Sequence, residues 1–255
     1  MAGLERTAGT DDDEGSPFAR PGFLVAGVLV LVVVLLGAIV AVRVGRSNNA
    51  STPPATSTAP SASQASTGAP ADPSASVCGL TGTAGEGTVT DAPAAAWEYD
   101  DTTAYPSSPE FGPGQRASEG YRYCFQHTPT GAVFATANAL AQGASSDLGK
   151  IDSWAQYFVS EGSGRSRVLA ELNEPRGDNT GVRMSIVGFK VLSYDAQAAR
   201  VDLALQTSGS AQTVYASAAY ELAWQGGDWK LNSDAPTPFN FATVPTVAGY
   251  IPWKA

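Results

Sequence analysis

The sequence predicts an α+β fold, with one N-terminal transmembrane helix, a disordered stalk, and then helices packed on a curved four-stranded antiparallel sheet. Three observations support this prediction. An uncharged apolar run occupies residues 23–42, apolar residues recur at spacings of three and four after Gly120, and they alternate with a period of two after Gly177. Helices gathered before consecutive strands are typical of α+β domains, in which a sheet packs against one helical layer.

The apolar run reads FLVAGVLVLVVVLLGAIVAV and carries no charge. At about 1.5 Å per residue it is long enough to span a hydrocarbon core of about 30 Å. A cleaved signal peptide is the alternative, but its apolar core has about 7 to 15 residues and ends in a small-residue cleavage site. This run is longer and leads into Arg43 and Arg46. We therefore expect an uncleaved single-pass anchor in contact with the lipid bilayer.

The segments on either side of the anchor are not expected to fold. Residues 1–22 contain few apolar groups and an acidic cluster, which predicts a disordered cytoplasmic tail. Residues 43–76 form a linker rich in Ser, Thr, Pro and Ala, a composition that buries too little apolar surface to fold.

The orientation of the anchor is predicted from the cysteines and the linker. Two arginines lie on each side of the apolar run, so the positive-inside count does not decide the orientation. The two cysteines, Cys78 and Cys124, both follow the linker, which suits one disulfide in an oxidising compartment. We expect a cell-membrane protein with a cytoplasmic N-terminus and an extracytoplasmic C-terminal domain.

Residues 77–120 are rich in Gly, Pro and Thr, with isolated aromatic residues, and predict an irregular lead-in segment. Residues 121–255 predict the α+β domain itself. It begins with a short strand at 121–125, in which aromatic side chains alternate with Arg122 and Cys124.

Three helices are expected next. Thr128 and Pro129 suit the N-cap and first position of the first helix. A second helix should begin near Asp147, and a third, shorter one should follow. Their apolar stripes are Val133, Ala137, Leu140, Ala141 and Ala144, then Ile151, Trp154 and Phe158, then Val168, Leu169 and Leu172.

Four strands are predicted from the period-two pattern, at residues 184–194, 200–207, 213–225 and 229–232. Short polar loops join the first three strands. Gly226 and Gly227 form a tight turn before the fourth strand, because glycine adopts the positive φ angles that such turns require.

This order of helices and a meander ending in WQGGDWKL (224–231) resembles the nuclear-transport-factor-2-like superfamily. The ending looks like that of membrane-tethered extracytoplasmic domains of actinobacteria and of conjugation or type IV secretion assembly factors. Residues 120–135 (GYRYCFQHTPTGAVFA) are similar to a segment of uncharacterised actinobacterial membrane proteins. The resemblance implies a conical sheet that can enclose a pocket, a scaffold that hosts both enzymes and interaction modules. No residue here matches the Asp and His of the superfamily's enzymes.

Candidate chemistry near the cysteines is incomplete. Cys124 and His127 have a Cys-x-x-His spacing, which occurs in zinc sites and in thiolate–base pairs. A structural zinc site needs four ligands, whereas the chain has one His and two Cys. We expect Cys78 to pair with Cys124 as a structural disulfide, and His127 to cap the strand-to-helix junction or to lie half exposed.

Two carboxylates and four tryptophans are the remaining candidates. Asp202 and Glu221 alternate toward the polar side of their strands, so we expect exposed acids, with a lining role in a pocket as the alternative. Trp97, Trp154, Trp224 and Trp229 suit core packing, and alternatively frame a pocket or a binding surface.

The composition narrows the function. With 15 Lys and Arg against 24 Asp and Glu, the net charge of −9 argues against direct nucleic-acid binding. No residues assemble into a catalytic, cofactor-binding or metal site. We expect a non-enzymatic interaction or assembly module that contacts envelope proteins, in a conjugation or secretion apparatus. A small-ligand-binding or enzymatic domain of the same fold and a stalked surface adhesion protein are the alternatives. The oligomeric state is left open.

Overall fold

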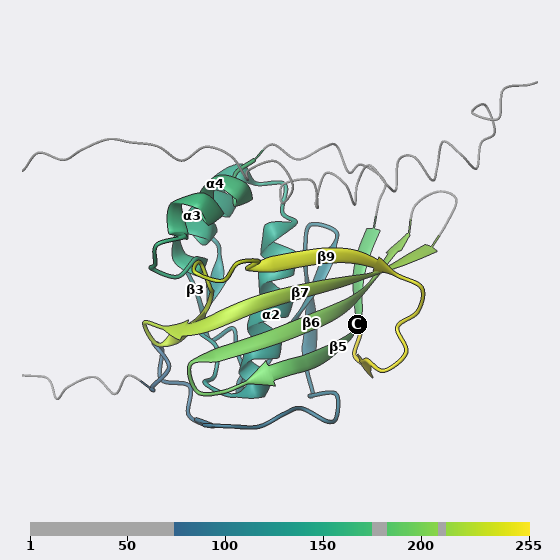
Figure 1. Cartoon of the computed structure of the whole chain (residues 1–255), viewed down its shortest axis with the longest axis horizontal. Coiled ribbons are helices and arrows are strands. Elements are labelled where there is room, and N and C mark those ends of the chain that lie inside the picture. The colour runs from purple at the N-terminus through teal and green to yellow at the C-terminus, as the bar shows by residue number, and fades with distance from the viewer. Residues whose placement is uncertain (1–73, 175–182, 209–212) are drawn as a thin grey trace, which may run out of the picture.

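The computed structural model describes residues 74–174, 183–208 and 213–255 (Figure 1). The helices within these ranges are α2 (Pro129–Gly143), α3 (Leu148–Phe158) and α4 (Arg165–Leu172). The strands are β1 (Ala96–Asp100), β2 (Thr103–Ser107), β3 (Gln115–Arg116), β4 (Arg122–Tyr123), β5 (Arg183–Tyr194), β6 (Ala198–Ser208), β7 (Thr213–Gln225), β8 (Asp228–Leu231), β9 (Phe239–Val244) and β10 (Ile251–Pro252).

The predicted tail, transmembrane helix and most of the linker lie outside the described residues. None of the helices in the described part of the chain is long and apolar enough to cross a membrane.

The prediction of a four-stranded sheet is wrong, because the main sheet has six strands in the order β10-β5-β6-β7-β8, with β9 also paired to β7. All of its pairs are antiparallel. The four strands predicted from the alternating pattern are present as β5 to β8. Strand β7 is long enough to hold two partners on one edge: β8 pairs with residues 222–225 and β9 with residues 215–220.

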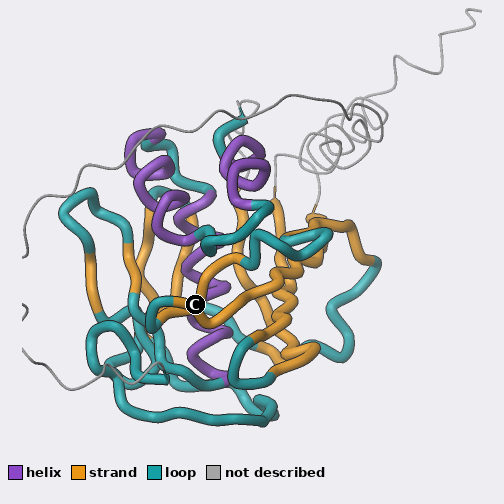
Figure 2. Tube along the Cα trace, turned by 60° about the vertical axis from the view of Figure 1, so that its left-hand side comes forward, coloured by secondary structure: helices purple, strands orange, loops and turns teal. Residues whose placement is uncertain are grey.

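Helix α2 runs through the centre of the domain and not along one side of it. Thirteen of its residues are buried, so the prediction of a single apolar face is too narrow. Figure 2 shows the helix with strands on both sides, the main sheet on one and the β1–β2 hairpin on the other. A helix that is covered all round carries small or apolar residues on every side, as this alanine-rich one does.

The lead-in segment supplies the β1–β2 hairpin that covers α2 on the side opposite the main sheet. The prediction that this segment is irregular is therefore also wrong. Residues 96–107 form the β1–β2 hairpin, and β3 pairs with β4 in a second small sheet. The start of α2 agrees with prediction: the Thr128 side chain caps the helix by accepting a hydrogen bond from the Gly131 N–H, with Pro129 at its first position.

The two shorter helices also agree with the sequence. Asp147 is the N-cap of α3, which buries Ile151, Trp154 and Phe158, and α4 buries Val168. Both helices lie at one end of the main sheet (Figure 1). There Val159 forms a parallel bridge with Leu231 of β8.

Candidate functional site

A buried carboxylate, Asp228 at the start of β8, organises the end of the sheet near α3. Its Oδ2 atom accepts hydrogen bonds from the Cys124 N–H and the Tyr157 hydroxyl, both at 2.7 Å. Its Oδ1 atom accepts from the Phe125 N–H at 2.8 Å and from the Trp229 N–H at 2.9 Å. The carboxylate therefore ties the segment after β4 and helix α3 to β8.

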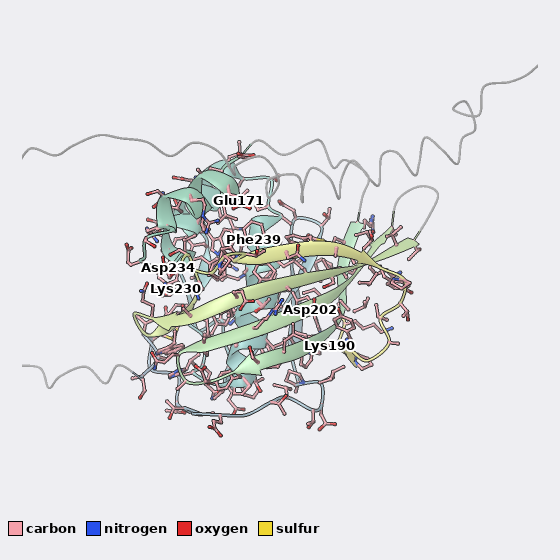
Figure 3. The ribbon with its side chains drawn as sticks, in the orientation of Figure 1. Glu171, Lys190, Asp202, Lys230, Asp234 and Phe239 are labelled. Atoms are coloured by element: carbon pink, nitrogen blue, oxygen red, sulfur yellow. A yellow bond between two sulfur atoms is a disulfide. The ribbon has the colours of Figure 1, made fainter. Side chains whose placement is uncertain are left out.

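Half-buried Tyr157 and buried Lys230 complete a polar cluster with Asp228. The Lys230 ammonium lies 2.9 Å from the centre of the Tyr157 ring, a cation–π contact. Burial raises the pKa of Asp228, opposed by Lys230 and by the donors around it. Burial also lowers the pKa of Lys230 to about 8, although the Asp228 charge opposes the shift. Figure 3 places Lys230 at the end of the sheet, near Asp234.

The structure pairs Cys78 with Cys124 in a disulfide, next to this polar cluster. His127 is buried, so the expectation of a junction cap or a half-exposed ring is wrong. Its ring stacks on Trp224 with 3.8 Å between centroids. The ring nitrogens contact the carbonyl oxygens of Ser74 and Ala196 at 2.9 and 2.7 Å. His127 thus joins the end of the linker, at Ser74, to the β5–β6 turn.

An open groove runs along the β1–β2 hairpin. It consists of two hollows, of about 290 and 570 Å³, that share Glu98, Ser107 and Pro113. We call it the hairpin groove. The smaller hollow is polar and is also lined by Tyr105, Arg116 and Arg122. The larger one is bounded by small residues and proline: Ala94, Ala95, Ala96, Ser108 and Pro109.

Several contacts hold Arg122 of β4 at the polar end of the groove. Its Nε donates to Asn138 at 2.9 Å and its Nη1 to Asp100 at 2.7 Å. The guanidinium lies 3.6 Å from the centre of the Tyr105 ring. In the part of the chain that the structure describes, Arg122 Nη2 is the one buried side-chain nitrogen or oxygen without a hydrogen-bond partner. Buried donors in native proteins are nearly always satisfied, so this atom requires an explanation.

The other charges at the polar end are held in their ionised forms. Hydrogen bonds from Tyr105 and Ser107 keep the pKa of Glu98 below its usual value. Burial opposes the ionisation of Asp100, but hydrogen bonds from Lys150 and Arg122 outweigh it and lower the pKa of Asp100. The polar hollow therefore presents one carboxylate, Glu98, beside two guanidinium groups.

The four tryptophans singled out from the sequence do not surround a common cleft. Trp154, Trp224 and Trp229 are buried in the core, and Trp229 meets Trp224 at 5.2 Å between ring centroids. Trp97 is half-buried and contacts Trp253 at 5.1 Å.

The two strand carboxylates differ from each other. Asp202 faces away from the core as its alternation predicts, but the expectation that it is exposed is wrong. The hydroxyl groups of Tyr250 and Ser217 both donate to it at 2.6 Å, and Tyr250 covers it. Glu221 is partly exposed and forms an ion pair with Arg200 at 2.9 Å. Figure 3 shows Asp202 along the middle of the sheet, far from Lys230.

Residues 58–252 match the model of a protein family described as a domain of unknown function (DUF8175). The chain belongs to this family. The match includes the lead-in hairpin as well as the main sheet, so the DUF8175 domain extends over both covers of α2. No curated protein and no solved structure matches the chain.

Sequence reasoning missed the residues that build both sites of this DUF8175 domain. The turn predicted at Gly226 and Gly227 and the strand predicted from residue 229 leave Asp228 unassigned. Arg122 is predicted only as a polar residue that alternates with aromatic ones in a short strand. The available signal was in α2, where Asn138 and Gln142 interrupt an apolar helix four residues apart. Both bind Arg122: Asn138 accepts from its side chain, and the Gln142 Oε1 atom accepts from its backbone N–H at 2.5 Å.

Proposed function

We propose that this chain is a membrane-anchored, extracytoplasmic interaction module that docks envelope proteins through one exposed corner of the domain. The observation that carries the proposal is the exposure of two large apolar side chains at this corner, Tyr99 at 69 % and Leu148 at 79 %. Exposed aromatic and aliphatic anchors are the residues on which protein–protein affinity depends.

Tyr99 and Leu148 belong to segments that contact each other. Asp101, in the turn after β1, accepts a hydrogen bond from the Ser146 N–H at 2.9 Å. Asp100 binds Lys150 in an ion pair at 2.6 Å. These contacts hold the β1–β2 turn against the connection between α2 and α3. A surface fixed in advance loses less conformational entropy on binding, which favours docking.

The membrane location is proposed from the sequence and from the disulfide. The uncharged run at 23–42 suits an anchor in the lipid bilayer, and a paired Cys78–Cys124 suits an oxidising compartment. A reporter enzyme that is active only outside the cytoplasm should work when fused after Ala255. Activity of a cytoplasmic reporter alone at this position would overturn the proposed orientation.

The docking surface can be tested by site-specific photo-crosslinking in the native cell. A photoreactive residue introduced at position 99 or 148 should yield a discrete protein adduct, and Leu148→Ser should weaken the adduct formed from position 99. Position 192 is the matched control, because Leu192 is also apolar and 46 % exposed but lies in β5. Equal adducts from all three positions would contradict docking at this corner.

A further inference from the structure

We propose that the hairpin groove binds the free carboxyl end of an extended peptide, with the carboxylate at Arg116 and Arg122 and the preceding residues along the alanine- and proline-lined hollow. This inference rests on the proposed interaction function and gives it a second, chemically defined site.

The two adjoining hollows together have the length that an extended peptide requires. Ala96 is the cross-strand partner of Ser107 and Glu98 is that of Tyr105, so these four side chains share one face of the hairpin. Both hollows are lined by Glu98 and Ser107, so they adjoin each other along the hairpin. A five-residue strand at about 3.3 Å per residue extends over roughly 16 Å, the length of four to five extended residues.

The polar end provides unused donors for an anion. Arg122 Nη2 has no hydrogen-bond partner in the described part of the chain, but the atom is buried, so Arg122 contributes positive charge and Arg116 contributes the accessible donors. Arg116 is exposed, and its guanidinium donates to the Gly120 carbonyl and to the Tyr105 hydroxyl, at 3.2 and 3.3 Å, which leaves three of its five N–H groups for a ligand. Planar guanidinium groups match a carboxylate in geometry as well as in charge.

Glu98 restricts which anion fits. Its ionised carboxylate lies in the same hollow as the two arginines and would repel a phosphate dianion more strongly than a carboxylate with a single charge. The same carboxylate can accept a hydrogen bond from a peptide N–H. The larger hollow is lined by alanine and proline and suits small apolar side chains. A peptide terminus combines a single negative charge, N–H donors and small side chains.

The test uses the purified full-length protein and fluorescein-labelled tetrapeptides with Ala, Val, Pro or Ser at each position, each as a free acid and as a C-terminal amide. Fluorescence anisotropy should detect free acids that bind below about 1 mM, with the matching amides at least about tenfold weaker, because a charge-assisted hydrogen bond is worth about 1.5 to 3 kcal/mol. Equal binding of acids and amides, or no binding in the whole set, would overturn the proposal.

Variants and competitors locate the site. Arg116→Gln should weaken binding at least about tenfold without changing the melting temperature, whereas Arg183→Gln, the same charge change at an exposed position in β5, should have no effect. Arg122→Lys should also weaken binding, but a change at this buried residue can affect folding. The binding measured for Arg116→Gln therefore decides whether the site is located correctly.

Competition distinguishes a peptide site from a general anion site. N-acetylalanine should displace the labelled peptide at lower concentration than acetate or inorganic phosphate does, and Glu98→Gln should make phosphate a better competitor. Phosphate competing as well as N-acetylalanine in the unmodified protein would overturn the peptide assignment. The proposed corner is tested separately, because crosslinking from position 99 should persist in the Arg116→Gln protein.

Discussion

Replacing Asp228 with asparagine should destabilise the domain although the two side chains have nearly the same shape. Each carboxylate oxygen accepts two hydrogen bonds, and each accepts at least one from a backbone N–H, that of Cys124 or of Phe125. The amide NH₂ of asparagine is a donor. Whichever way it is oriented, it must face a buried backbone donor and leave that donor without an acceptor.

The size of the effect follows from these contacts. One buried N–H without a partner costs about 1 to 3 kcal/mol, and the remaining bonds weaken because their acceptor is no longer charged. Burial of the charged carboxylate is costly, which is why the pKa of Asp228 is raised. Asparagine carries no charge and avoids this cost, so part of the loss is offset. We therefore expect a loss of about 2 to 3 kcal/mol, which lowers the melting temperature of a domain of this size by roughly 4 to 12 °C.

The assay is thermal and urea unfolding of the purified protein at pH 7, followed by near-ultraviolet circular dichroism and tryptophan fluorescence. Asp91→Asn is the matched control, because Asp91 is exposed and accepts a hydrogen bond from its neighbour Thr90, and its melting temperature should change by less than about 1 °C. If Asp228→Asn also changed the melting temperature by less than about 1 °C, the carboxylate would not be the anchor described above.

Three further substitutions, and Gly149→Ala as a control, test other parts of the structure. Lys230 loses its proton near pH 8 in the folded protein and near pH 10.5 in the unfolded chain. The free energy of unfolding should therefore rise by up to about 2 kcal/mol between pH 8 and pH 9.5. Lys230→Met should remove this rise. A methyl group at Gly131 would collide with the carbonyl of Gln126, so Gly131→Ala should cost more than about 2 kcal/mol in urea unfolding. Gly149→Ala, in an open part of α3, should be neutral or stabilising. Trp253→Ala should lower the free energy of unfolding by about 3 to 5 kcal/mol, because this side chain is only 4 % exposed. A decrease below about 1 kcal/mol would contradict its place in the core.

The parts of the fold that could be predicted have local signals. Thr128 and Asp147 are side-chain caps, and the long alternating strands keep one period over many residues. Strand β9 has the same alternation in Phe239 and Phe241, but only over a few residues between prolines, and β10 contains Pro252. Their pairing depends on β7 and β5, distant partners that a local pattern does not reveal.

The candidate sites were less predictable, because each joins residues that are far apart in the chain. Asp228 binds the N–H of Cys124 across 104 positions, and Arg122 binds Asp100 across 22. Nothing in either residue's neighbourhood distinguishes a buried carboxylate from a turn residue, or a buried arginine from an exposed one. The disulfide was the exception, since two cysteines allow one pairing.

The disulfide and Asp228 together make the shape of the hairpin groove depend on the oxidation state of the cysteines. Cys124 has a φ angle of +70°, a conformation that costs a non-glycine residue about 1 to 2 kcal/mol. It is held there by the bond to Cys78 and by the hydrogen bond from its N–H to Asp228. The Cys124 carbonyl in turn accepts from the Gly114 N–H at 2.8 Å, and Gly114 lines the polar hollow.

Arg122 precedes Cys124 by two residues, so both walls of the polar hollow depend on the backbone at Cys124. Without the disulfide, the loop from Cys78 to Cys124 is no longer closed, and the constraint of about 4 kcal/mol that a closed loop of this length provides is lost. The groove should therefore reach its binding geometry only after the cysteines are oxidised. Under the proposed function, oxidation of Cys78 and Cys124 would complete the peptide site in the compartment where the envelope partners are proposed to lie.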